Sequence, residues 1–185
     1  MAGKITEMTV NNSPVLTDIQ EFTSDPSGTP LTRSTTIQGI HDALADYAEI
    51  NANSTGTAQT TINSSDYTKI DQFDNEGISS SSTPSSANDQ ITVGTTGVYV
   101  ISVGISFNGT GSETYTIAMY RDGVVDVDTL IIRKLGTGGD VGRVASTHIE
   151  SLTAGEVLDL RVKSLAGSGD SFQVESANFS IIRIV

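Results

Sequence analysis

The fold is decided by the stretch Gly97-Val98-Tyr99-Val100-Ile101-Ser102-Val103-Gly104-Ile105-Ser106-Phe107. Large apolar side chains recur at every second position from Tyr99 to Phe107, and small residues such as Ser102 and Ser106 alternate with them. Because successive side chains of a β-strand point to opposite faces, this period of two predicts a strand with one face in a core.

The same alternation extends through the C-terminal half of the chain. Residues 156–163 place Leu158 and Leu160 on one face and Arg161 on the other. Clusters of turn-forming residues separate the runs at the spacing of a sandwich or barrel. This half is therefore predicted to be all-β. Four further runs belong to it, at residues 114–121, 124–134, 144–150 and 172–185.

The composition restricts both partners and sources of stability. Ten Lys and Arg residues stand against 22 Asp and Glu residues, which gives a formal net charge of −12 at pH 7. Nucleic acid is an unfavourable partner, since phosphate binding depends on cationic side chains, and anionic lipid headgroups are repelled. The chain has no cysteine, and no apolar stretch is long enough for membrane insertion. Its 185 residues must therefore rest on core packing or on assembly.

The first fifty residues are organised differently. Two strand-like runs, residues 18–22 and 31–36, flank a reversal rich in Pro and Gly, which predicts a hairpin. Thr36 caps a predicted helix that reaches Ala48, because apolar residues recur there at helical spacing. Such a unit buries too little apolar area to be stable alone, so it is predicted to dock on a larger body. We predict three segments: a β-hairpin and helix module over 1–50, a linker over 51–64 and a β-domain over 65–185.

Five blocks follow one another in the β-domain: Phe73-Asp74-Asn75, Ile91-Thr92-Val93-Gly94-Thr95-Thr96-Gly97-Val98-Tyr99, Tyr115-Thr116-Ile117-Ala118-Met119-Tyr120-Arg121-Asp122-Gly123, Leu152-Thr153-Ala154-Gly155-Glu156-Val157-Leu158-Asp159-Leu160 and Ser176-Ala177-Asn178-Phe179-Ser180. In this order they resemble the globular head of complement component 1q and its tumour necrosis factor relatives. The resemblance implies a ten-stranded jelly-roll sandwich that forms a homotrimer. The chain departs from the family pattern at Ile101 and at Ile181-Ile182, so the vertebrate signalling partners are not implied.

The N-terminal residues carry a second, looser pattern. It comprises Lys4-Ile5-Thr6-Glu7-Met8-Thr9, a strand around Asp18, Asp25-Pro26-Ser27-Gly28-Thr29-Pro30-Leu31-Thr32-Arg33 and Thr36-Ile37. The pattern resembles the short attachment module of tail-fibre and head-fibre proteins of tailed bacteriophages. This resemblance implies a structural protein of the virion surface, assembled in the host cytoplasm. Residues 1–50 would then bind other virion proteins, and the trimeric knob would face outward toward host surface glycan.

Three function classes stay open at this point. The first is a fibre or appendage of the virion, and the second is a capsid decoration protein that stabilises the shell without binding a receptor. The third is a glycan-processing enzyme, but His41 and His148 are far apart in sequence and lack the spacing of a catalytic triad. The chain is therefore predicted to be no enzyme and to need no cofactor. Asp122, Asp126 and Asp128 lack the spacing of an EF-hand and are interpreted as solvated carboxylates at strand edges.

Alternating strands place successive turns at opposite ends of the sandwich. One end is predicted to hold residue 65, Val185 and the turns at 94–97, 122–123 and 153–155. The other end is predicted to hold the longer, Gly-rich loops at 108–112, 136–140 and 166–170. Loops on a rigid scaffold commonly carry recognition, so the second end is predicted to be a distal tip.

The candidate recognition residues of this tip are Asn108, Glu113, Asp140 and Asp170. Threefold symmetry would bring three copies of each loop together. The functional interpretation is a shallow glycan site, with calcium as the cation that these carboxylates would hold. The alternative interpretation is solvated loop charge without a ligand.

Overall fold

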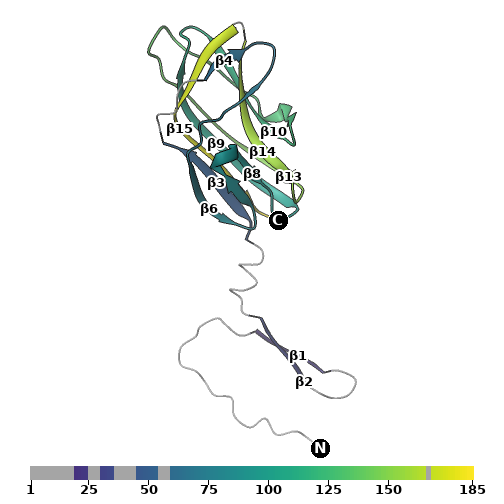
Figure 1. The fold of residues 1–185 in the computed structure, drawn as a ribbon. Coiled ribbons are helices and arrows are strands. Elements are labelled where there is room, and N and C mark those ends of the chain that lie inside the picture. The colour runs from purple at the N-terminus through teal and green to yellow at the C-terminus, as the bar shows by residue number, and fades with distance from the viewer. Residues whose placement is uncertain (1–18, 25–29, 36–44, 54–58, 166–167) are drawn as a thin grey trace, which may run out of the picture. The chain divides into compact units, whose positions relative to one another are not determined.

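The computed structural model describes residues 19–24, 30–35, 45–53, 59–165 and 168–185. The chain divides into two units, Met1–Ala45 and Asp46–Val185 (Figure 1). No helix within the described residues is long and apolar enough to cross a membrane.

The described part of the first unit is a β-hairpin. Strands β1 (Ile19–Ser24) and β2 (Pro30–Thr35) pair antiparallel, with Ile19 opposite Thr35. This confirms the predicted hairpin. Residues 36–44, where most of the predicted helix falls, lie outside the described residues.

The second unit is a sandwich of two antiparallel sheets. Sheet I has the order β13-β9-β15-β3-β6, and β4 also pairs with β15. Sheet II has the order β11-β10-β14-β8-β7, with β12 beside β10 and β5 beside β14. Several strands have only two or three residues, so the described sandwich holds more strands than the ten predicted.

The strands of sheet I are β3 (Tyr47–Ala52), β4 (Gln59–Asn63), β6 (Asn75–Ser80), β9 (Gly97–Gly109), β13 (Gly142–Leu152) and β15 (Ser168–Arg183). The strands of sheet II are β5 (Thr68–Lys69), β7 (Thr83–Ser85), β8 (Gln90–Thr92), β10 (Thr114–Arg121), β11 (Val124–Val125), β12 (Ile131–Lys134) and β14 (Val157–Ser164). Two short 3-10 helices, η1 (Ser86–Asn88) and η2 (Val127–Thr129), lie in the connections.

The core lies between the two sheets, and the predicted alternation is confirmed. From sheet I, β9 buries Tyr99, Ile101, Val103, Ile105 and Phe107. From sheet II, β14 buries Leu158, Leu160 and Val162. Each such side chain contributes about 1.5–3 kcal/mol by leaving water, which supplies the stability that a chain without disulfides needs.

The sandwich begins earlier in the chain than predicted. Tyr47 and Ala48 were expected at the end of a helix, yet they start β3, which pairs with β15. Strand β4 also pairs with β15 and lies within the residues predicted to be a linker. Ala48, Ile50 and Ala52 are buried with period two. Their packing in sheet I favours a strand, although the apolar residues before them recur at helical spacing. A chain cut at residue 65 would therefore lack two strands of sheet I.

The two ends of the sandwich hold the turns largely as predicted. At one end, the base, the Ala154 amide donates to Thr96 Oγ1 at 3.0 Å and the Val98 amide donates to Val185 O at 2.8 Å. The base also receives Asp46, whose carbonyl accepts from Arg183 N at 2.8 Å. Residue 65 was expected at the base, but it follows β4, which pairs with residues 168–172 at the opposite end. We call that opposite end the tip (Figure 1).

Candidate functional site

The tip brings its three loops together, as the alternation of turns predicts. The Thr110 amide donates to Ser171 O at 3.3 Å, and the Ser112 amide donates to Gly136 O at 2.6 Å. Tyr115 fastens them from the core, because its hydroxyl donates to Ser171 O at 2.7 Å and accepts from Thr110 N at 2.9 Å. Burial raises the pKa of the Tyr115 hydroxyl, which keeps this donor protonated. The tip is thus a braced surface.

Two of the four candidate recognition residues form hydrogen bonds within the sandwich. The side-chain amide of Asn108, near the end of β9, donates to the Glu175 carboxylate of β15. Glu113 Oε1 accepts from the neighbouring Thr114 amide at 3.0 Å. Both side chains therefore shape the tip from within.

The two aspartates differ from each other in their surroundings. Asp140 Oδ2 accepts from the Gly136 amide at 2.7 Å and lies 3.7 Å from Arg133 Nη2, so it closes its own loop. Asp170 is only 8% exposed, and its Oδ2 atom has no hydrogen-bond partner among the described residues. The interpretation of Asp170 as solvated loop charge is therefore wrong, because β15 extends further toward the tip than expected and draws it inward.

The described tip residues do not gather into a group of metal ligands. Among the described residues, no three His, Cys, Asp or Glu side chains lie together in a group that could hold a metal ion. The interpretation that calcium binds the tip carboxylates therefore has no set of ligands in the described part of the chain.

The side chains on the outer face of sheet I change from apolar near the base to polar toward the tip. This arrangement could not be located from the linear sequence. Residues paired across antiparallel strands point to the same side of a sheet, so the register defines rows across this face. The row nearest the base that runs across β13, β9, β15 and β3 is apolar, and it includes Ile149 and Ile182, which are 69% and 54% exposed. Its members are Ile149, Val100, Ile182 and Tyr47.

Two polar rows follow on the way to the tip. The first consists of Thr147, Ser102, Ser180 and Glu49. The second consists of Ala145, Gly104, Asn178 and Asn51. We call these three rows the association face. Only the small outward residues of β9 hinted at it in the sequence, because the rows depend on strand register.

The association face is hollowed in two places. A polar hollow of about 330 Å³ lies over Gly104 and is bordered by Arg143 and Asn178. A Cβ atom added at Gly104 would have no neighbour within 4 Å, so the glycine opens this hollow. An apolar hollow of about 280 Å³ lies between Tyr47, Ile78 and Ile182 at the base end of the face. Both hollows can receive side chains from another molecule.

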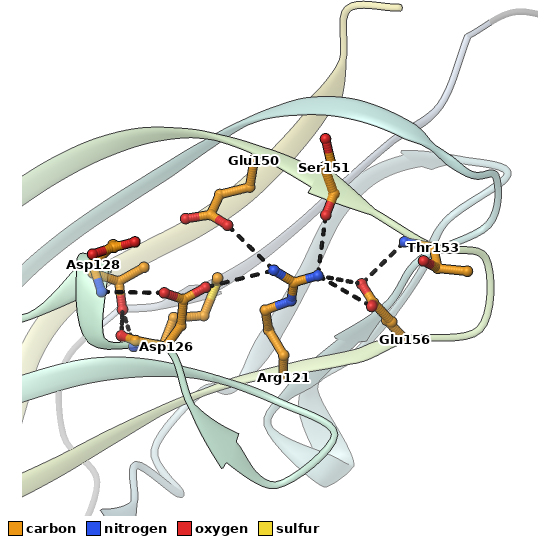
Figure 2. A network of polar contacts seen from close by, with 9 residues as sticks. Arg121, Asp126, Asp128, Glu150, Ser151, Thr153 and Glu156 are labelled. Carbon is orange, nitrogen blue, oxygen red and sulfur yellow. Dashed lines mark hydrogen bonds and ion pairs between the residues drawn. The ribbon is translucent and has the colours of Figure 1, made fainter.

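A second concentration of polar groups surrounds Arg121 near the base (Figure 2). Arg121 Nη2 lies 3.1 Å from Glu156 Oε1 and donates to Ser151 O at 3.0 Å. Arg121 Nη1 lies 3.3 Å from Glu150 Oε2 and 3.7 Å from Asp126 Oδ2. The guanidinium of Arg121, on β10, thus contacts strand β13, the turn between β13 and β14, and the connection between β11 and η2.

Asp126 is correspondingly not the solvated carboxylate predicted from the sequence. Its side chain is largely buried, pairs with Arg121 and accepts from the Asp128 amide at 3.2 Å, which caps η2. The distant partner, Arg121, comes from another strand, so spacing within residues 122–128 could not indicate it.

Glu150 gives this network a pH dependence. Burial raises the pKa of Glu150, Asp126 raises it further, and Arg121 opposes both. A carboxyl whose pKa is higher in the folded state stabilises the fold below its ordinary value of 4.5, and that stability is lost as pH rises through the folded pKa. We therefore expect Glu150→Gln to become more stable relative to the wild type as pH rises above 4.5. Urea unfolding at several pH values measures this difference, and a difference independent of pH would contradict it.

Ser146 and His148 form a contact that the sequence analysis did not anticipate. Ser146 Oγ lies within hydrogen-bond distance of His148 Nε2, on the inward face of β13. The hollow beside His148 has a volume of only about 10 Å³, which is room for about one water molecule. A substrate has no space there, so we interpret the pair as an edge contact of the sandwich. His41 lies outside the described residues.

Comparison with known proteins identifies the fold. No protein-family model matches the chain, and no curated protein matches it. Among solved structures, the Eiger TNF of S. frugiperda matches with a TM-score of 0.58 and 14% identity, over 76% of this chain and 93% of that one. The globular domain of zebrafish complement 1qA matches with a TM-score of 0.54 and 12% identity, over 76% of this chain and 98% of that one. The sandwich therefore has the jelly-roll fold of TNF and complement 1q globular domains, as the sequence blocks predict.

Proposed function

We propose that this protein is a homotrimeric structural and interaction protein, in which three copies pack through the association face of sheet I. The observation that carries the proposal is the apolar row at the base end of this face. Ile149 and Ile182 flank Val100 in this row and are exposed in the single chain, and an exposed apolar row of this kind is typical of an interaction surface. Burial between copies would remove this row from water.

The rest of the association face suits close packing of copies. Ser102, Gly104 and Ser180 are small and allow a neighbouring backbone to approach. Glu49 and Arg143 carry opposite charges on this face, so neighbouring copies can offer each other complementary groups. Together with the sequence resemblance, these features favour a closed ring of three copies over a monomer.

A matched pair of glycine variants tests the proposed trimer. In Gly104→Arg the new side chain meets open space in the single chain, yet it fills the hollow that a neighbouring copy needs. Gly138→Arg at the tip also meets open space and serves as the control. We expect wild type and Gly138→Arg at three times the 19.4 kDa chain mass, and Gly104→Arg at the single-chain mass. Light scattering at micromolar concentration measures these masses, and a monomeric wild type would overturn the proposal.

The second part of the proposal concerns the larger assembly to which the trimer belongs. We infer that it is an appendage of a tailed bacteriophage, either a tail fibre or a head fibre, with its first unit attached to other virion proteins. The support is the N-terminal sequence pattern of residues 4–37. The tip, braced by Tyr115, would then face outward and is available for host surface glycan.

A deletion at the boundary between the two units tests this placement. A chain beginning at Asp46 keeps every described strand of the sandwich, so it is expected to fold and trimerise. The same chain is expected to be missing from virions when it replaces the full-length protein, which immunogold labelling of particles would reveal. Labelling at normal copy number would refute attachment through the first unit.

A further inference from the structure

The outer face of sheet II gathers half of the cationic side chains of the sandwich. Four of its eight Lys and Arg residues lie there, on a chain whose net charge is −12. Register places Arg161 opposite both Lys69 and Ala118, and it places Lys163 opposite Thr116. Lys134 of β12 lies opposite Thr114 on the same face. We call the set Lys69, Lys134, Arg161 and Lys163, with Tyr67 and Tyr120, the cationic strip.

Two tyrosines order the cationic strip. The Arg161 guanidinium lies 4.0 Å from the centre of the Tyr120 ring, and Lys163 Nζ lies 4.8 Å from the centre of the Tyr67 ring. The two rings meet edge to face with 5.6 Å between their centres. Such contacts hold long, flexible side chains in place before a ligand arrives. A pre-organised set of cations binds an anion at lower entropic cost.

The charges of the cationic strip are only partly neutralised within the chain. Asp159 is bonded to Arg161, with 2.7 Å between Asp159 Oδ1 and Arg161 Nε. No carboxylate partner is found for Lys163 or Lys134 among the described residues. Two strand spacings across the sheet and two residues along it separate their Cα atoms by about 12 Å. Two separate lysine charges are therefore available to a ligand.

A buried hydroxyl lies in the floor of the cationic strip. Thr116 faces outward between Ile132 and Lys163, and it is 4% exposed because longer side chains cover it. Its Oγ1 atom has no hydrogen-bond partner within the described residues. A buried hydroxyl without a partner costs stability, so its retention here indicates a partner that the isolated chain does not contain.

We propose that the cationic strip binds an acidic polysaccharide, with Lys134 and Lys163 pairing with its anionic groups. The Thr116 hydroxyl would bond a sugar oxygen once the longer side chains that cover it turn toward the ligand. Duplex DNA is a poorer fit, because it carries a charge about every 1.7 Å along its axis and would meet the repulsion of the whole acidic chain. A polysaccharide with sparser charges matches lysines spaced this widely.

The proposal goes beyond the proposed function, because the cationic strip lies on the outer face of sheet II and not at the tip. It does not depend on trimer formation, because every residue of the cationic strip comes from one chain. The strip lies on the sheet opposite to the association face, so assembly through sheet I would leave it open.

Calorimetric titration of the full chain with polygalacturonate oligomers tests the proposal. Neutral dextran and a short duplex DNA are titrated separately, as an uncharged polysaccharide and as an anion of another class. We expect binding of polygalacturonate alone, weakened by salt. Lys163→Gln is expected to lower the affinity about tenfold. Lys4→Gln makes the same charge change in the first unit and is expected to leave the affinity unchanged. Thermal unfolding confirms that each variant is folded.

Thr116→Val separates a ligand contact from a structural role. Valine removes the unpartnered hydroxyl, so the melting temperature is expected to hold or rise, while the affinity for polygalacturonate falls about fivefold. Gly104→Arg is expected to bind polygalacturonate with normal affinity even when it is monomeric. This variant therefore tests the binding proposal independently of the trimer proposal. Unchanged binding by Lys163→Gln, an equal loss in Lys4→Gln, or equal binding of dextran or DNA would each overturn the proposal.

Discussion

Replacing Phe172 by alanine is expected to lower the free energy of unfolding by about 4 kcal/mol. Phe172 is fully buried, its ring centre lies 4.7 Å from that of Phe107 and 5.8 Å from that of Tyr115. The cavity left by the ring would remove these contacts and loosen the Tyr115 hydroxyl that fastens the tip loops to Ser171. Urea unfolding at one protein concentration measures the loss, since the stability of an oligomer depends on concentration.

Val141→Ala is the matched control for this prediction. Val141 precedes β13 near the tip and is largely exposed, so its truncation is expected to change the unfolding free energy by no more than about 0.5 kcal/mol. A similar small value for Phe172→Ala would show that the aromatic cluster does not stabilise the tip.

The sandwich could be predicted because its longest strand carries an unambiguous pattern. Every second residue from Tyr99 to Phe107 is apolar and large, and these residues are buried. Strand β3 could not be predicted in the same way, because Tyr47-Ala48-Glu49-Ile50 fits both a helical and a strand period in a single sequence. The choice is made by β15, which comes more than a hundred residues later and supplies the hydrogen bonds.

The candidate sites divide along the same line. The alternation of strand direction was sufficient to group the tip loops. Successive turns fall at opposite ends of the sandwich, so counting the turns along the chain assigns each loop to an end. The burial of Asp170, the rows of the association face and the partners of Arg121 depend on register and on contacts between sheets. A shift of one residue in register would turn every side chain of a strand to the other face. Such features therefore cannot be derived from local spacing.

Asp46→Ala is expected to be the second most damaging substitution, with a loss of about 3 kcal/mol in the free energy of unfolding. Asp46 is the first residue of the sandwich and is 2% exposed. Its carboxylate accepts from the Ser82 amide at 2.9 Å, from the Ser82 hydroxyl and from the Tyr99 hydroxyl at 2.6 Å. Alanine would leave the Ser82 hydroxyl buried without its acceptor, whereas the Ser82 amide keeps Ser80 O at 2.7 Å. The desolvation cost of the hydroxyl outweighs the net value of the bonds themselves.

Asp46→Asn and Tyr99→Phe show whether the hydrogen bonds carry this effect. Asparagine keeps the shape and one acceptor, so about 1 kcal/mol should be lost, because Tyr99 can donate to Thr95 O at 2.6 Å instead.

Burial, followed by the bond to Asp46, raises the pKa of Tyr99 to about 12. Its ordinary value is 10.0, so the protonated phenol stabilises the fold below pH 10.0, and this contribution is lost as pH rises toward about 12. Tyr99→Phe should remove that alkaline loss, and equal costs for Asp46→Ala and Asp46→Asn would contradict the assigned role of the acceptor.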